Sequence, residues 1–182
     1  MSRTYLAVPG ALTDSECDAA IALADGGRTA RGPVYGGAGY HVDPDVRDVQ
    51  STLVARADAT WLFARLDSLF AAAAAPFGLP VGPIGEEIQV LRYDEGGHFR
   101  TWHSDAGLDG VERRRISMSV ELSERGDYDG GELEVVPDLV GRARTLPRGS
   151  AQIFPSRALH RVTPVVRGTR WALVAWTGAP AG

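Results

Sequence analysis

The second half of the chain, from about residue 86, is a succession of short strand patterns, and this feature limits the possible folds more than any other. The strand patterns are separated by turn signals such as Asp129-Gly130-Gly131 and Pro147-Arg148-Gly149. The predicted strands cover residues 87–93, 99–105, 115–122, 131–136, 142–146, 150–154, 159–164 and 170–177. Short strands at this spacing predict two packed antiparallel sheets in a sandwich, barrel or jelly roll.

The first half of the chain has helical patterns. After a short strand at residues 4–8, Thr13 and Glu16 match a capping box, and the helix that they open is expected to end at Gly26-Gly27. A second helix is predicted over residues 56–75, with Pro76 and Gly78 ending it. The expected fold is therefore mainly β with N-terminal helices, and the β part is a jelly roll.

A chain of 182 residues has the size of one domain. We expect a single domain over residues 1–182, in which residues 1–85 provide helical support and a loop, and residues 86–178 form the jelly-roll core. Residues 26–45 are rich in glycine and carry two arginines and two tyrosines, namely Arg28, Arg31, Tyr35 and Tyr40. A long loop is predicted there, and loops of that length act as lids or are disordered.

Charge and cysteine content narrow the cellular setting. The formal net charge of -4 argues against a nucleic-acid partner or an anionic membrane surface. The single cysteine, Cys17, cannot form an internal disulfide, and the N-terminus lacks a signal-peptide pattern. No apolar stretch is long enough to cross a bilayer. A cytoplasmic protein without a membrane partner is expected, and its oligomeric state stays open.

Two of the four histidines lie in a pattern that suits a metal. His103 and Asp105 are two residues apart, so on a strand their side chains point to the same face. His160 lies on a later predicted strand and can supply a third ligand. Two histidines and one carboxylate that leave coordination positions open suit non-haem iron(II) and oxygen chemistry. A His-x-Asp pair alone also fits a surface pair at a strand end.

Arg170 follows His160 after a turn, so the two residues can approach the same cavity. A guanidinium in an apolar cavity is costly unless an anion pairs with it. One interpretation is a clamp for the distal carboxylate of a dicarboxylate cosubstrate. The other is an interior salt bridge to Glu121 or Glu132.

These residues lie in segments that resemble the prolyl 4-hydroxylase-like branch of the 2-oxoglutarate/iron(II) oxygenases. Residues 93–105 resemble the first metal motif of that family, and residues 154–165 are similar to the second. Residues 115–123 resemble the core strand between the two motifs, and residues 128–133 resemble the family's Gly-Gly-Glu-Leu hairpin. Residues 168–171 match the segment that carries the cosubstrate arginine. The segments occur in the family's order over about residues 86 to 178, while residues 1–85 match loosely.

The resemblance implies a double-stranded β-helix and a full set of site residues. His103, Asp105 and His160 are the implied iron(II) ligands, and Arg170 the implied partner of the 2-oxoglutarate C5 carboxylate. Three residues are implied to line or contact the cosubstrate pocket: Tyr93, Ser119 and Val162. Oxygen is a further cosubstrate, and ascorbate stays open as an additional cofactor. Trp176 is expected to pack under the pocket.

The expected function is hydroxylation of an unactivated C–H bond in an amino acid or peptidyl residue, with decarboxylation of 2-oxoglutarate to succinate and carbon dioxide. The partner is then a small molecule or peptide. A natural-product scaffold is the alternative substrate. A cupin-like module that binds a metal or sugar without oxygen chemistry, or a zinc hydrolase, are the alternative protein classes.

Three residues near the motifs need separate treatment. Glu121 stands where many relatives have a neutral polar side chain or a tyrosine, and near Arg170 it would compete with the cosubstrate. His98 has the opposite strand parity to His103 and is predicted at the rim or surface. His41, in the expected loop, is predicted at the surface.

Overall fold

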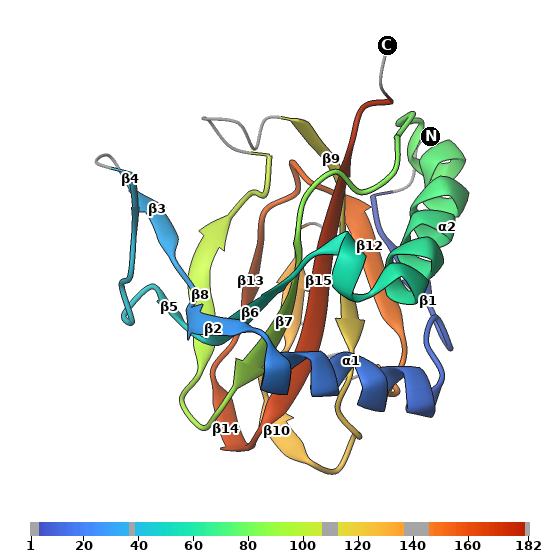
Figure 1. The fold of residues 1–182 in the computed structure, drawn as a ribbon. Coiled ribbons are helices and arrows are strands. Elements are labelled where there is room, and N and C mark those ends of the chain that lie inside the picture. The colour runs from blue at the N-terminus through green and yellow to red at the C-terminus, as the bar shows by residue number, and fades with distance from the viewer. Residues whose placement is uncertain (1–3, 37–38, 107–112, 137–145, 181–182) are drawn as a thin grey trace.

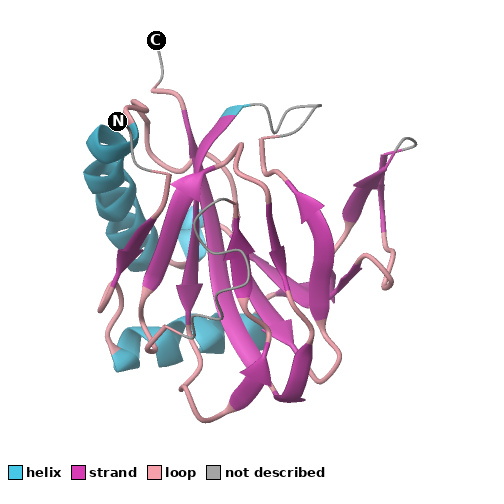
Figure 2. Ribbon diagram, turned by 180° about the vertical axis from the view of Figure 1, so that it is seen from behind, coloured by secondary structure: helices cyan, strands magenta, loops and turns pink. Residues whose placement is uncertain are grey.

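The computed structural model describes residues 4–36, 39–106, 113–136 and 146–180. Within these ranges the chain forms two main antiparallel sheets, with the helices against the larger one (Figure 1). The opposite view shows the strands of the two sheets rising together from one end of the molecule (Figure 2). The architecture is a jelly roll supported by N-terminal helices, which confirms the expected fold class.

The larger sheet has seven described strands, and every neighbouring pair is antiparallel. In spatial order the strands are β1 (Leu6–Val8), β12 (Ala151–Pro155), β9 (Arg114–Glu121), β15 (Arg170–Gly178), β7 (Ile88–Tyr93), β6 (Gln50–Val54) and β2 (Arg28–Arg31). The long central strand β15 therefore lies between β9 and β7.

The smaller sheet carries the predicted metal motifs. Its described strands, in order, are β11 (Leu133–Val135), β13 (His160–Val162), β8 (His98–His103) and β5 (Arg47–Asp48). Two strand pairs lie beside the main sheets: β10 (Tyr128–Gly130) with β14 (Val165–Gly168), and β3 (Val34–Gly36) with β4 (Gly39–His41).

Both predicted helices are present. Helix α1 spans Asp14–Gly26 and begins with the expected capping box, in which Glu16 N donates to Thr13 Oγ1 and Thr13 N donates to Glu16 Oε2. Helix α2 spans Thr60–Phe77, after the 3-10 turn η1 (Arg56–Asp58). Its end is set by Gly78, whose φ of 66° is left-handed, whereas Pro76 lies inside the last turn.

Strand alternation divides the interior into two hydrophobic clusters. On β7, Ile88 and Val90 pack against the helices, while Leu91 and Tyr93 face the smaller sheet. Strand β9 behaves in the same way: its apolar residues point toward the helices and its polar residues point inward between the sheets. Side chains alternate between the two faces of a strand, so one face of the larger sheet packs against the helices and the other faces the smaller sheet. The polar inward face of β9 forms part of a cavity wall.

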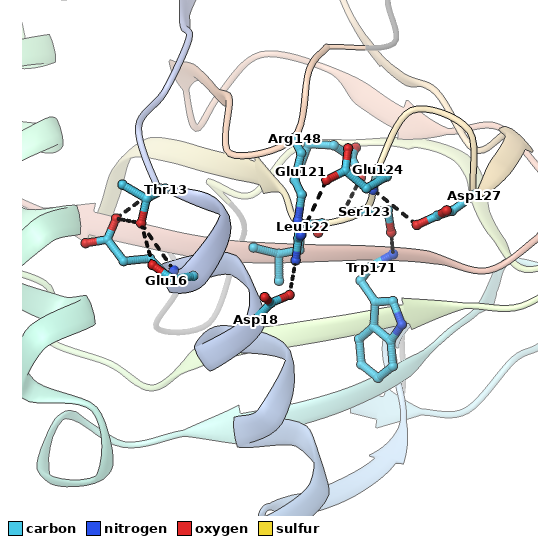
Figure 3. A network of polar contacts seen from close by, with 11 residues as sticks. Thr13, Glu16, Asp18, Glu121, Leu122, Ser123, Glu124, Asp127, Arg148 and Trp171 are labelled. Carbon is cyan, nitrogen blue, oxygen red and sulfur yellow. Dashed lines mark hydrogen bonds and ion pairs between the residues drawn. The ribbon is translucent and has the colours of Figure 1, made fainter.

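Arg148 connects helix α1 to the segment that follows β9 (Figure 3). Its Nε donates to Leu122 O at 2.8 Å, and its terminal nitrogens pair with Asp18 of α1 and Glu124. Close by, Trp171 N donates to Ser123 Oγ at 2.7 Å. These contacts hold the end of β9 against the start of β15, where the inward-facing Glu121 and Arg170 lie.

The predicted long loop at residues 26–45 is wrong, because its described residues include β2, β3 and β4. All four residues of β2 are exposed, so no apolar alternation marks the strand in the sequence. It is a strand because its backbone pairs with β6. Strands β5, β6, β10 and β14 were not predicted either, and the predicted strand at 142–146 falls almost entirely outside the described residues. In the described part of the chain, no helix is long and apolar enough to cross a membrane.

Candidate metal centre

The three predicted metal ligands converge between β8 and β13. His103, the last residue of β8, pairs across the sheet with His160, the first residue of β13. Asp105 lies just beyond β8, in a turn held by a hydrogen bond from Asp105 N to Ser156 O at 2.9 Å. One side-chain ligand atom from each residue lies within 4.8 Å of the other two.

Backbone contacts orient both imidazoles for coordination. His103 Nδ1 lies 2.9 Å from Thr101 O, and His160 Nδ1 lies 3.0 Å from Ala158 O. A carbonyl oxygen can only accept, so each Nδ1 carries a proton, and in the neutral form of each ring Nε2 keeps the lone pair that a metal would bind. This is the arrangement that fixes the tautomer of metal-binding histidines in proteins.

The charges of the site favour a neutral His103 beside an ionised Asp105. Burial, followed by the charge of His160, lowers the pKa of His103 to about 4. Burial on its own would raise the pKa of Asp105, but His160, His103 and a hydrogen bond from Ser117 bring it well below its usual value. His160 Nε2 lies 3.4 Å from Asp105 Oδ2, and this carboxylate outweighs burial and raises the pKa of His160.

Ser117 supports the carboxylate from the opposite sheet. Its Oγ donates to Asp105 Oδ2 at 2.7 Å and lies 2.9 Å from Ser156 Oγ. Ser117 is on β9, on the inward face that also carries Ser119 and Glu121. The donor set fits an iron(II) ion, because two neutral imidazole nitrogens and one carboxylate would occupy one side of the metal and leave other positions free.

A cavity of about 680 Å³ opens from this cluster between the two sheets. The other predicted site residues, Arg170, Tyr93, Ser119 and Val162, all line it, and so does Trp176. The residues that the sequence analysis selected therefore lie around one cavity. The roles predicted for them remain expectations at this point.

At the inner end of the cavity, Arg170 is held by a carboxylate of the protein itself. Arg170 Nε lies 3.0 Å from Glu121 Oε2, and the two side chains are 3% and 5% exposed. Although burial opposes ionisation, the charge of Glu121 raises the pKa of Arg170, so the guanidinium stays charged. The interior salt bridge that the sequence left open is thus formed, with Glu121 and not with Glu132 as partner.

The prediction that His98 lies at the rim or surface is wrong. His98 is 2% exposed, its Nδ1 lies 2.9 Å from Gly96 O, and its Nε2 lies 3.4 Å from Asp45 O. Its parity does turn it away from the metal cluster, but the segment before β5, which supplies Asp45 O, lies against its ring, and the side chain is buried. His41 is exposed, as expected.

Sequence reasoning gave no role to several residues of the cavity wall. These residues are Ser117, Arg47, Phe99 and Gln89. No sequence signal marks Arg47, because β5 is two residues long and its partner β8 is distant in the chain.

Fold and site together define a jelly roll with a candidate metal cluster in the wall of a cavity between its sheets. The model of the 2OG-Fe(II) oxygenase superfamily matches residues 88–178, which is half of the chain. The chain belongs to this superfamily. The match covers the strands that carry all three candidate ligands and Arg170.

Curated relatives share this same part of the chain. A PKHD-type hydroxylase of Idiomarina loihiensis is 39% identical over 90 residues, which are 49% of this chain and 40% of that protein. A PKHD-type hydroxylase of Paracoccus denitrificans is 44% identical over 92 residues, 47% of this chain and 40% of that protein. The chain thus spans about two fifths of the length of these relatives.

Solved structures resemble the whole fold. A prolyl-4-hydroxylase of Pseudomonas putida aligns with a TM-score of 0.75 and 20% identity, over 98% of this chain and 94% of that one. A viral collagen prolyl hydroxylase from Paramecium Bursaria Chlorella virus-1, solved as a 2OG complex, aligns with a TM-score of 0.69 and 22% identity, over 97% of each chain. At these identities the likeness establishes the jelly-roll fold.

Proposed function

We propose that this protein is a 2-oxoglutarate- and iron(II)-dependent dioxygenase that hydroxylates an unactivated C–H bond of an amino acid or peptidyl residue. The observation that carries the proposal is one cavity with a two-histidine, one-carboxylate cluster in its wall and a buried arginine at its inner end. Both features match what the superfamily needs, a metal site and a cation for a dicarboxylate. The hydroxylase names of the relatives and of the similar structures support the reaction type.

In this proposal His103, Asp105 and His160 hold the iron(II). The metal, with 2-oxoglutarate and oxygen, supplies the oxidising chemistry and converts the cosubstrate to succinate and carbon dioxide. The protein holds the ligands in place through Thr101 O and Ala158 O, and Ser117 keeps one carboxylate oxygen of Asp105 hydrogen-bonded. Ascorbate remains an open additional cofactor.

Arg170 is the proposed partner of the C5 carboxylate of 2-oxoglutarate. Glu121 occupies Nε of this guanidinium, so the cosubstrate would bind the N–H donors of its terminal nitrogens. Glu121 both orients Arg170 and repels an incoming carboxylate. Three neighbours form the proposed walls of this subsite: Tyr93, Ser119 and Val162.

The experiment is an assay of succinate release from iron(II), 2-oxoglutarate and oxygen, run across amino acids and short peptides and paired with mass spectrometry of the product. The expected result is iron-dependent succinate formation that rises with the substrate, together with a product heavier by one oxygen atom. Absence of iron-dependent 2-oxoglutarate turnover would contradict the proposal and favour the cupin-like module. The alternative natural-product substrate has no specific feature of the cavity in its favour.

A further inference from the structure

Arg47 lies one aromatic ring away from the metal cluster. It is on β5, where its backbone pairs with Phe99 of β8. Its guanidinium carbon is 5.0 Å from the centre of the Phe99 ring. The Phe99 ring in turn stacks on His103, with ring centres 3.6 Å apart and planes 16° apart. Arg47 and Phe99 both line the cavity, so this stack connects a cation to a candidate metal ligand.

The hydrogen bonds of Arg47 leave its charge uncompensated. Nη1 donates to Pro33 O at 2.9 Å and Nη2 donates to Gln89 Oε1 at 3.2 Å, so two of the five N–H donors of the guanidinium are used, both on neutral acceptors. Nε is buried and has no partner. Gly32 packs against it so closely that a Cβ there would lie 2.7 Å from Nε.

The other arginines of the cavity wall are different, since each has a carboxylate partner among the described residues. These ion pairs are Arg28–Glu87, Arg31–Asp48, Arg114–Glu86 and Arg170–Glu121. Arg47 has no carboxylate within ion-pair distance in the described part of the chain. Asp105, the sole carboxylate in the described cavity wall, is already engaged by His160 and Ser117.

Arg47 keeps some exposed surface, but its Nε is buried, and a guanidinium that is partly withdrawn from water without a counter-ion is unfavourable. Burial lowers the pKa of Arg47, with smaller opposing effects from Tyr93 and Asp105. An anion that entered the cavity would recover the lost charge–charge interaction and could use the unfilled donors in charge-assisted hydrogen bonds. The cavity therefore contains a cationic position beside the metal cluster, on β5 of the smaller sheet, whereas Arg170 lies on β15 of the larger sheet.

We propose that Arg47 binds the carboxylate of the primary substrate, which makes the substrate an amino acid with a free α-carboxylate and not a residue inside a peptide chain. This inference rests on the proposed function. It assigns the two cavity arginines to two anions: Arg170 to the cosubstrate and Arg47 to the substrate. A separation of one ring from His103 suits a small molecule whose reacting carbon is a few bonds from its carboxylate.

The first test uses the native chain and matched probes. Iron-loaded protein with 2-oxoglutarate is assayed with the common L-amino acids, with their N-acetyl derivatives and with the N-acetyl amides, which mimic residues inside a peptide. At least one carboxylate-bearing probe should stimulate succinate release, and its amide should be at least about tenfold weaker, as expected for one charged hydrogen-bonded contact. Amides that work as well as acids, or acids that all fail, would overturn the inference.

The second test compares Arg47→Gln with Arg92→Gln. Arg92 also packs on an aromatic ring and pairs with a carboxylate, but it does not line the cavity. Anaerobic calorimetry should show binding of the best acid probe weakened by about tenfold to a hundredfold in Arg47→Gln, and unchanged in Arg92→Gln. Iron content and the dissociation constant of 2-oxoglutarate should be the same in both variants.

Two results of the second test would overturn the inference. If Arg47 serves only to tie Pro33 and Gln89 together, acids and amides will weaken equally in Arg47→Gln. If it serves the cosubstrate, the affinity for 2-oxoglutarate will fall instead. Should Arg47→Gln not fold, the acid and amide comparison on the native protein still decides.

Failure of the proposed function has a separate signature. Iron-dependent succinate formation by the native protein, with any of the probes or with none, tests the reaction class. If that activity is present and carboxylates are not preferred, only the role of Arg47 is wrong. If it is absent, the reaction class fails and the inference fails with it.

Discussion

Glu121 on β9 and Arg170 on β15 form a buried ion pair at the inner end of the cavity, with Arg170 Nε 3.0 Å from Glu121 Oε2. Both side chains point inward from neighbouring strands of the larger sheet. A buried pair of this kind is costly to break from one side, because the remaining charge is left without a partner. It also decides how strongly Arg170 can bind a second carboxylate.

Glu121→Gln should strengthen 2-oxoglutarate binding. The change removes the carboxylate that competes for Arg170, while the amide oxygen can still accept from Nε. The unliganded variant should be less stable than the native protein, by about 3–5 kcal/mol if the whole pair is lost. Calorimetry should therefore give a lower dissociation constant, and thermal unfolding should give a larger rise in Tm on addition of 2-oxoglutarate.

The matched control is Glu134→Gln, since Glu134 pairs with Arg161 outside the cavity wall. It should leave the affinity for 2-oxoglutarate unchanged. Weaker 2-oxoglutarate binding in Glu121→Gln would show that Glu121 is needed to orient Arg170 and is not a competitor.

Arg170→Lys should raise the KM for 2-oxoglutarate more than Arg161→Lys, because a lysine cannot reproduce the two bonds of a guanidinium on a carboxylate. Arg170→Ala should be worse, by about 2–4 kcal/mol for one lost buried charged pair. Steady-state kinetics with varied 2-oxoglutarate measure both effects. An unchanged KM in Arg170→Ala would leave Arg170 with a purely structural role beside Glu121.

His103→Ala, Asp105→Ala and His160→Ala should each lose iron binding and turnover while keeping the native circular dichroism spectrum. His98→Ala provides the contrast, since His98 is buried but contacts the carbonyls of Gly96 and Asp45 and the side chain of Arg100, none of which belongs to the metal cluster. It should cost about 1–3 kcal/mol of stability for the hydrogen bonds left unmade, with iron content retained. Metal analysis and denaturant unfolding separate the two outcomes, and full turnover in the three ligand variants would refute the metal assignment.

Ser117→Ala should weaken iron binding by about tenfold or more, which is the usual effect of removing a hydrogen bond to a metal-binding carboxylate. The reason is the 2.7 Å contact from Ser117 Oγ to Asp105 Oδ2. Ser119→Ala is the comparison and should keep iron affinity, because Ser119 lies on the same strand face but, among the described residues, it is Ser117 that donates to Asp105. Equal iron affinity in both variants would remove Ser117 from the metal site.

The strand pair β3–β4 remains a candidate lid. Tyr40 of β4 lines the cavity, and so does Arg31, which precedes the pair in the chain. Replacing residues 34–41 with a short flexible linker should uncouple the enzyme, so that succinate still forms while hydroxylated product falls. Quantifying both products in one reaction measures the coupling, and a normal ratio would end the lid hypothesis. Strand β2 must be kept, because it is part of the larger sheet.

The sequence by itself determined the jelly roll and the residues of the metal cluster. Alternation along β7, β9 and β15 fixes which side chains face inward, because a strand's period of two holds wherever one face is buried. The capping box at Thr13 is equally local, since its two bonds join residues three positions apart. The pairing of His103 with Asp105 is also local, because the two residues are two positions apart in the chain, although Asp105 lies just past the end of the strand.

Only the tertiary structure decided the contacts between segments that are distant in the chain. Strand β2 has no apolar alternation and exists through its pairing with β6, and His98 is buried in contact with Asp45 O, from a segment distant in the chain. The choice of Glu121 over Glu132 as partner of Arg170 depends on which strands are neighbours in the larger sheet. Arg47 is the clearest example, because its lack of a counter-ion among the described residues depends on which side chains surround it in the assembled cavity wall. No local pattern of residues in the sequence predicts this.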